Sequence, residues 1–119
     1  MASANDLRPP GERTYGLEHV AVGADVRVSA LSLVGDQCVD WHWHTHTSDI
    51  FFCLEGTAVV ETHNPGDSVL VHVGDRYDVL PGVPHRVTPL DGKRCRFLLV
   101  QGVGKADFHL GRPSLSPSS

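Results

Sequence analysis

Short runs of apolar and β-branched residues, separated by turn-forming residues, follow one another along most of the chain. The runs 17–22 and 26–34 are separated by a Gly-Ala-Asp turn, and a further run at 50–54 is continuously apolar. Similar runs occupy 57–62, 68–73, 77–80, 86–88 and 96–101. No segment has the periodicity of an amphipathic helix. The pattern predicts about eight to ten short strands, and therefore an all-β sandwich, small barrel or jelly roll.

The chain is expected to form a single domain, because it has 119 residues, no internal repeat and one compositional regime. Residues 1–16 contain a Pro-Pro-Gly sequence and little periodicity, which predicts an extended N-terminal arm. The barrel is expected to span 17–110. The Ser- and Pro-rich segment 111–119 predicts a disordered tail.

One stretch departs from the usual alternation of apolar and solvent-facing polar residues in a strand. His42, His44 and His46 occupy alternate positions, so in an extended strand all three rings project from one face. The opposite face carries Trp41, Trp43 and Thr45. Neutral imidazole is the commonest metal ligand in proteins, and Asp49 adds a carboxylate shortly afterwards. The stretch therefore predicts the first half of a metal site.

The second half must come from elsewhere in the chain, because ligands on one strand cannot surround an ion. Residues 74–85 begin with a Gly-Asp turn, continue as a short strand, turn again at a Pro-Gly pair and end at His85. We expect His85 to be the fourth ligand.

These two segments resemble the two sequence motifs of the cupin family. In the first motif, G-x5-H-x-H-x3/4-E-x6-G, His42 and His44 fill the histidine positions and Asp49 fills the glutamate position. Gly56 fills the last glycine position, whereas the leading glycine is missing near Gln37.

In the second motif, G-x5-P-x-G-x2-H-x3-N, Gly74, Gly82 and His85 match in register, and Leu80 and Pro89 replace the proline and the asparagine. The resemblance covers roughly residues 35–100. It implies a single-domain cupin double-stranded β-helix, or jelly-roll barrel, with one divalent transition metal near its middle. The ligands that it implies are His42, His44, Asp49 and His85.

The identity of the metal stays open, because three imidazoles with or without a carboxylate suit Fe, Mn, Ni, Co and Zn alike. Asp49 is one methylene shorter than glutamate, so it either ligates the metal directly or orients another ligand. His46 shares the face of the other histidines, and we consider it a candidate ligand or supporting group.

Residues on the inward face of the next strand are candidates for a substrate pocket. Phe51 and Cys53 share the parity of Asp49, so they are expected to point inward and line the cavity, although such residues commonly form plain core. Tyr77 is a third pocket candidate. Weaker candidates are Gln101 and Arg76.

Composition excludes several classes of partner. The net charge is −4 and the basic residues are scattered, which argues against nucleic acid and anionic membranes. No apolar stretch approaches the roughly 20 residues of a membrane span, and the first residues lack the pattern of a signal peptide. Three cysteines without the spacing of a zinc or redox motif fit reduced thiols in the cytoplasm. Trp41 and Trp43 are expected to pack against the arm or a partner subunit, which predicts a homodimer.

The resemblance implies a metal-dependent enzyme that acts on a small oxygen-rich or carboxylated substrate. Dioxygenase, decarboxylase, lyase, isomerase and cyclase chemistry all remain open, because no general acid or base stands out once the ligands are assigned. A non-catalytic module that binds a small molecule or sugar is the alternative. A structural protein stabilised by a metal is a third, weaker possibility.

Overall fold

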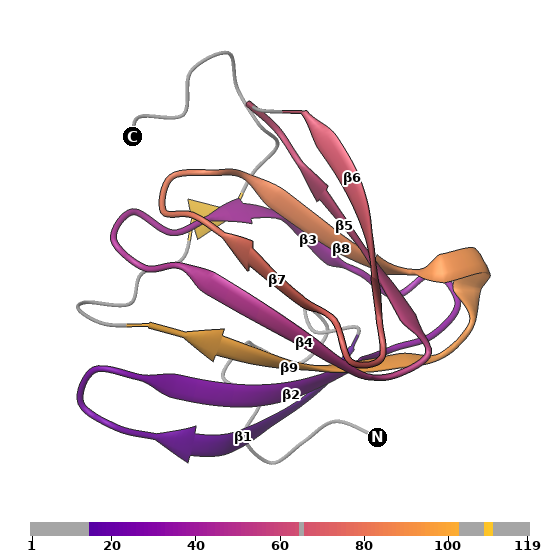
Figure 1. Ribbon diagram of the computed structural model, residues 1–119, viewed down its shortest axis with the longest axis horizontal. Coiled ribbons are helices and arrows are strands. Elements are labelled where there is room, and N and C mark those ends of the chain that lie inside the picture. Colours follow the sequence, from indigo (N-terminus) through magenta and orange to yellow (C-terminus); the bar gives the residue numbers. More distant parts are fainter. Residues whose placement is uncertain (1–14, 65, 103–108, 111–119) are drawn as a thin grey trace.

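The computed structural model describes residues 15–64 and 66–102, together with the backbone of 109–110. The predicted tail, and all but the last two residues of the predicted arm, lie outside the described residues. The described residues form ten β-strands and one short 3-10 helix (Figure 1). The elements are β1 (Gly16–Val22), β2 (Arg27–Leu33), β3 (Val39–Trp43), β4 (Asp49–Glu55), β5 (Thr57–Thr62), β6 (Asp67–His72), β7 (Arg76–Val79), β8 (His85–Pro89), η1 (Leu90–Gly92), β9 (Cys95–Gln101) and β10 (His109–Leu110).

The strands pair into two antiparallel sheets that face each other (Figure 1). One five-stranded sheet has the order β1-β2-β9-β4-β7, and the other has the order β10-β3-β8-β5-β6. Neighbours in both sheets are mostly distant in the sequence, as in a jelly roll. The prediction of an all-β jelly-roll barrel is therefore confirmed. Within the described part of the chain, no helix is long and apolar enough to cross a membrane.

The apolar core lies between the two sheets and follows from the alternation along each strand. In β5, Ala58, Val60 and Thr62 are buried, and the alternate residues, on the other face, are only half-buried. The core continues through both sheets with Leu31, Leu33, Val39, Phe51, Cys53, Val71, Val79, Val87, Cys95 and Phe97. Burial of these side chains removes apolar surface from water, which is the main force that holds the sheets together.

At one level of the barrel interior, polar residues replace the apolar ones. Asp49 of β4 lies two positions before the core residue Phe51, and His85 of β8 lies two positions before Val87. Because side chains at positions i and i+2 share a face of a strand, each of these polar groups lies directly next to the core. The barrel thus has an apolar part and an adjoining polar level.

A tight turn at Gly56 joins β4 to β5. Gly56 has a φ of 69°, a left-handed conformation that residues with a Cβ rarely adopt. A Cβ atom at this position would also collide with the carbonyl oxygen of Arg94. Gly35 has nearly the same φ, 66°, but no atom lies within 4 Å of the position its Cβ would take. The two glycines therefore separate the effect of conformation from that of close packing.

We expect Gly56→Ala to lower the free energy of unfolding by at least roughly 3 kcal/mol, because backbone strain and a steric collision add. Gly35→Ala is the matched control and should cost only about 1 kcal/mol, because strain acts there alone. Urea denaturation followed by circular dichroism measures both values. Equal losses for the two variants would contradict the close approach at Gly56.

Candidate metal centre

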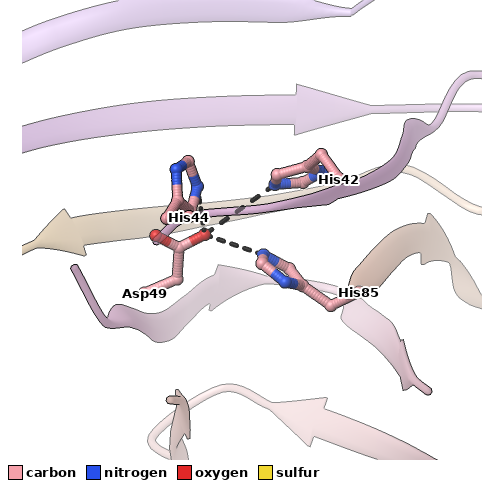
Figure 2. A group of neighbouring side chains, drawn as sticks. All are labelled: His42, His44, Asp49 and His85. Atoms are coloured by element: carbon pink, nitrogen blue, oxygen red, sulfur yellow. Dashed lines mark hydrogen bonds and ion pairs between the residues drawn. The ribbon is translucent and has the colours of Figure 1, made fainter. Parts of the chain in front are cut away.

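The two sheets place four potential ligands opposite one another inside the barrel. His42 of β3 lies beside His85 of β8 in one sheet, and Asp49 opens β4 in the other. His44 follows immediately after β3. All four side chains are buried, and Figure 2 shows them pointing toward one another.

A single carboxylate oxygen is the meeting point of this group. Asp49 Oδ2 lies 2.8 Å from His85 Nε2, 3.2 Å from His44 Nε2 and 3.8 Å from His42 Nε2 (Figure 2). One ligand atom from each of the four residues lies within 4.8 Å of the other three. Donors from two distant parts of the sequence therefore converge within reach of a single ion.

Hydrogen bonds on the far side of two rings determine what their inward nitrogens can do. His42 Nδ1 lies 2.6 Å from the carbonyl oxygen of Asp40, and His85 Nδ1 lies 2.9 Å from that of Val83. A carbonyl oxygen only accepts, so each Nδ1 carries the hydrogen and donates it. In the neutral ring, Nε2 then presents a lone pair to Asp49. Lone pairs facing a carboxylate oxygen are stabilised by a cation between them, so these residues fit a metal ion.

The electrostatics of the group favour the protonation states that metal binding needs. Burial lowers the pKa of His42 below its usual 6.5, more than the hydrogen bond to Asp49 raises it. Burial would raise the pKa of Asp49, but the three neighbouring imidazoles lower it well below its usual value. A neutral imidazole and an ionised carboxylate are the ligating forms of these side chains.

Only the first of the three predicted histidines, His42, lies within a strand, and only the first two belong to the group of metal ligands. β3 ends at Trp43, and the backbone carbonyl of His44 accepts a hydrogen bond of 2.7 Å from the amide of Gly82. This contact holds His44 in place beyond the strand end. His46 lies in the following bend with an exposed side chain, and the four-residue group does not include it. A supporting role for His46 stays a prediction.

Of the three pocket candidates, Phe51 lies nearest the metal ligands. Its ring packs edge-on against that of His85, with 6.0 Å between centroids and 82° between planes. Cys53 lies two residues farther along β4, inside the apolar core. Tyr77 is opposite Phe51 in the neighbouring β7 and packs against the same core.

The thiol of Cys53 fits a packing role. Its Sγ donates a hydrogen bond to the carbonyl oxygen of Gly56, at 3.2 Å, and burial raises its pKa, so the protonated form predominates at neutral pH. Contact of Phe51, Cys53 or Tyr77 with a substrate stays a prediction. The weaker candidate Arg76 is exposed and pairs with Asp78 on the outside of the barrel.

Gln101 belongs to the site, although the sequence marks it only as a weak candidate. Its side chain is buried, and its Nε2 lies 3.3 Å from both Asp49 Oδ1 and His44 Nε2. One signal in the sequence points to it. Gln101 shares its strand face with Cys95 and Phe97, so it is a polar residue at the inward end of an otherwise apolar face.

Comparisons with known proteins agree with this arrangement. Residues 33–101 match the family model described as the cupin domain, which confirms the resemblance seen in the sequence. An uncharacterized protein with a double-stranded β-helix domain from Klebsiella pneumoniae is 24% identical, with a TM-score of 0.74 over 89% of this chain and 90% of that chain. No curated protein gives a significant match.

Two solved structures with named activities share the fold at lower identity. A structure from a study of DMSP lyases is 17% identical, with a TM-score of 0.69 over 82% of this chain and 53% of that chain. An oxalate oxidase in complex with the substrate analogue glycolate is 13% identical, with a TM-score of 0.63 over 70% of this chain and 44% of that chain. At these identities, the likeness concerns the fold alone.

We expect acid to destabilise the metal-free protein partly through His42. Its folded-state pKa lies below the usual 6.5, so the unfolded chain binds the proton more readily. The resulting stability is fully present above pH 6.5 and is lost as the pH falls toward the folded-state value. This loss amounts to at most about 1.4 kcal/mol per pH unit.

Urea denaturation of the chelator-treated protein at several pH values between 5 and 7 measures this dependence. His42→Gln should flatten it. His72→Gln is the control, because His72 lies on the surface. If the free energy of unfolding depended on pH equally strongly in His42→Gln and in the wild type, protonation of this ring would not contribute to the loss of stability.

Proposed function

Because the chain belongs to the cupin family and holds four buried ligands within reach of one ion, we propose that it is a metal-dependent enzyme. Its proposed substrate is a small oxygen-rich or carboxylated molecule. The observation that carries the proposal is the position of one Asp49 oxygen opposite the Nε2 atoms of His42, His44 and His85.

The donor set supports a transition metal in an open site. Three imidazoles and one carboxylate would hold Fe, Mn, Ni, Co or Zn, and ligand type does not discriminate among them. Ions of this kind that take five or six ligands keep positions free for a substrate, as catalytic sites do. When bound, the metal would supply Lewis-acid polarisation of a chelated oxygen, or redox chemistry with dioxygen.

The charge of the site favours an anionic substrate. A divalent ion, one carboxylate and three neutral rings sum to one net positive charge, since +2 − 1 = +1. Inside the barrel this charge would be poorly screened, so a small carboxylate would be attracted to it. The oxalate oxidase solved with glycolate shows that a protein with this fold can accommodate a small carboxylate.

The protein's own residues would act chiefly by fixing the orientation of the ligand rings and by keeping water away from the site. The backbone carbonyls of Asp40 and Val83 fix two of the rings, so Nε2 faces the reacting centre without rearrangement. Phe51 closes the apolar side of the site next to His85 and keeps water away from that face.

A homodimer and a cytoplasmic location stay proposals that rest on the sequence. Trp41 and Trp43 are half-buried on the face of β3 opposite His42, so part of their apolar surface is available for a partner.

We expect the chelator-treated protein to bind one equivalent of a divalent transition metal, with loss of binding in His42→Ala and His85→Ala. Each substitution removes an inward nitrogen from the group. Isothermal titration with Mn, Fe, Co, Ni and Zn measures affinity and stoichiometry. At a metal concentration of 100 times Kd, the folded state should gain about 2.7 kcal/mol.

His72→Ala is the matched control for these variants, since the side chain of His72 is exposed and its ring pairs with Asp75 outside the group of metal ligands. Its affinity should equal that of the wild type. Metal binding that survives both His42→Ala and His85→Ala would overturn the proposed site.

We further expect the metal-loaded protein to convert a small carboxylate. A panel of hydroxy, keto and dicarboxylic acids, followed by NMR with a parallel oxygen electrode, tests this. Turnover with oxygen uptake would indicate an oxygenase, and turnover without it a lyase, decarboxylase or isomerase. Metal-independent binding without turnover would instead favour the alternative, a non-catalytic small-molecule or sugar-binding module.

A further inference from the structure

Three polar side chains lie next to one another across three strands at the level of the metal centre. Arg27 of β2 and Asp49 of β4 are the two cross-strand neighbours of Gln101 in β9. Asp49 and Gln101 are 1% and 4% exposed, and Arg27 is half-buried. A charged group outside the metal ligands is thus connected to them through one amide.

The arginine determines which way the amide of Gln101 points. Arg27 Nε donates to Gln101 Oε1 at 2.8 Å, and Nη2 donates to the same oxygen. A guanidinium has donors and no acceptor, so Oε1 must face Arg27 and the NH2 group must face the metal centre. Exchange of the amide oxygen and nitrogen would place NH2 against the guanidinium and lose both bonds.

The NH2 group so oriented reaches two of the ligands. Gln101 Nε2 lies 3.3 Å from Asp49 Oδ1 and 3.3 Å from His44 Nε2, and an amide NH2 has two hydrogens to donate. The bond to Oδ1 engages one oxygen of Asp49 and leaves the other, Oδ2, to the three Nε2 atoms. The bond to His44 requires a lone pair on Nε2, the form in which that nitrogen ligates a metal.

The amide also separates two opposite charges. If Arg27 contacted Asp49 directly, its positive charge would compete with a metal for the carboxylate. Through Gln101, the guanidinium polarises the NH2 group and strengthens its donation, while Oδ2 stays available.

We propose that Gln101, held in one orientation by Arg27, is a positioning residue that makes Asp49 present a single oxygen to the metal. This inference rests on the proposed function, since it concerns the same centre. Asp49 is shorter than the glutamate usual at this position, so an outside group that fixes its carboxylate has a direct effect on ligation.

The test measures Co(II) binding to the chelator-treated full chain by titration and by visible absorption, which reports the number and geometry of the ligands. Gln101→Leu should weaken Co(II) binding about 10–100-fold, the usual effect of losing a group that orients a metal ligand. It should also change the absorption spectrum, because the carboxylate can then rotate. A purely structural role would lower the melting temperature and leave the spectrum unchanged, and that outcome would overturn the inference.

Arg27 supplies a second, independent variant. Arg27→Met should weaken Co(II) binding by less than Gln101→Leu, and the double variant should bind no more weakly than Gln101→Leu alone, because Arg27 acts through the amide. Arg27→Lys keeps a cationic donor and should restore most of the affinity. Arg76→Met is the matched control, because it removes an arginine from the outer surface and should change nothing.

The outcomes separate the two proposals. A wild-type protein that does not bind Co(II), or any other metal of the series, would overturn the proposed function together with this inference. Wild-type binding that is equally tight in Gln101→Leu, with the same spectrum, would overturn the inference alone. Independent, additive losses in the double variant would overturn the role of Arg27. If Gln101→Leu does not fold, Arg27→Met tests the inference in its place. An unchanged Co(II) affinity and spectrum in Arg27→Met would overturn the inference.

Discussion

The structure of the site depends on one unfavourable arrangement, which is a carboxylate buried among imidazole nitrogens. An ionised carboxylate loses its hydration when it is buried, and Asp49 is 1% exposed. The amide of Gln101 donates a hydrogen bond to it, and an imidazole whose inward nitrogen is protonated also offsets that loss. The same groups would repel one another if every inward nitrogen were deprotonated, so a cation resolves the conflict. The apolar core supplies the stability that makes such a group tolerable.

Much of the fold could be predicted from local sequence patterns. Alternation in strands such as β5, and turn residues such as Gly56, are properties of short segments and do not need distant contacts. The turns around residues 74–85 made His85 the candidate fourth ligand, and the resemblance to a known family supported its convergence with His42 and His44, because no local pattern sets which strands meet across a barrel. Alternation along β4 predicts that Phe51 and Cys53 both point inward, and both are buried in the core. Alternation does not indicate how far along the barrel each residue lies from the metal ligands.

The remaining parts of the site were hidden for identifiable reasons. His46 keeps the parity of the other histidines, yet it lies three residues beyond the end of β3, in a bend where alternation no longer sets the direction of a side chain. Arg27 and Gln101 are 74 residues apart in the sequence, and only the register of β2 against β9 places them side by side. Sheet register of this kind depends on the whole core, which a single sequence does not reveal.

The ligands are drawn from both sheets, with His42 and His85 in one and Asp49 in the other. An ion bound by all of them would act as a noncovalent cross-link between two layers that otherwise adhere through apolar side chains. Any motion that parts the layers at this end would have to break a coordination bond. Release of the ion and local separation of the two sheets would then occur in the same step. The exchange rate of the metal would therefore measure how often the sheets separate at this end.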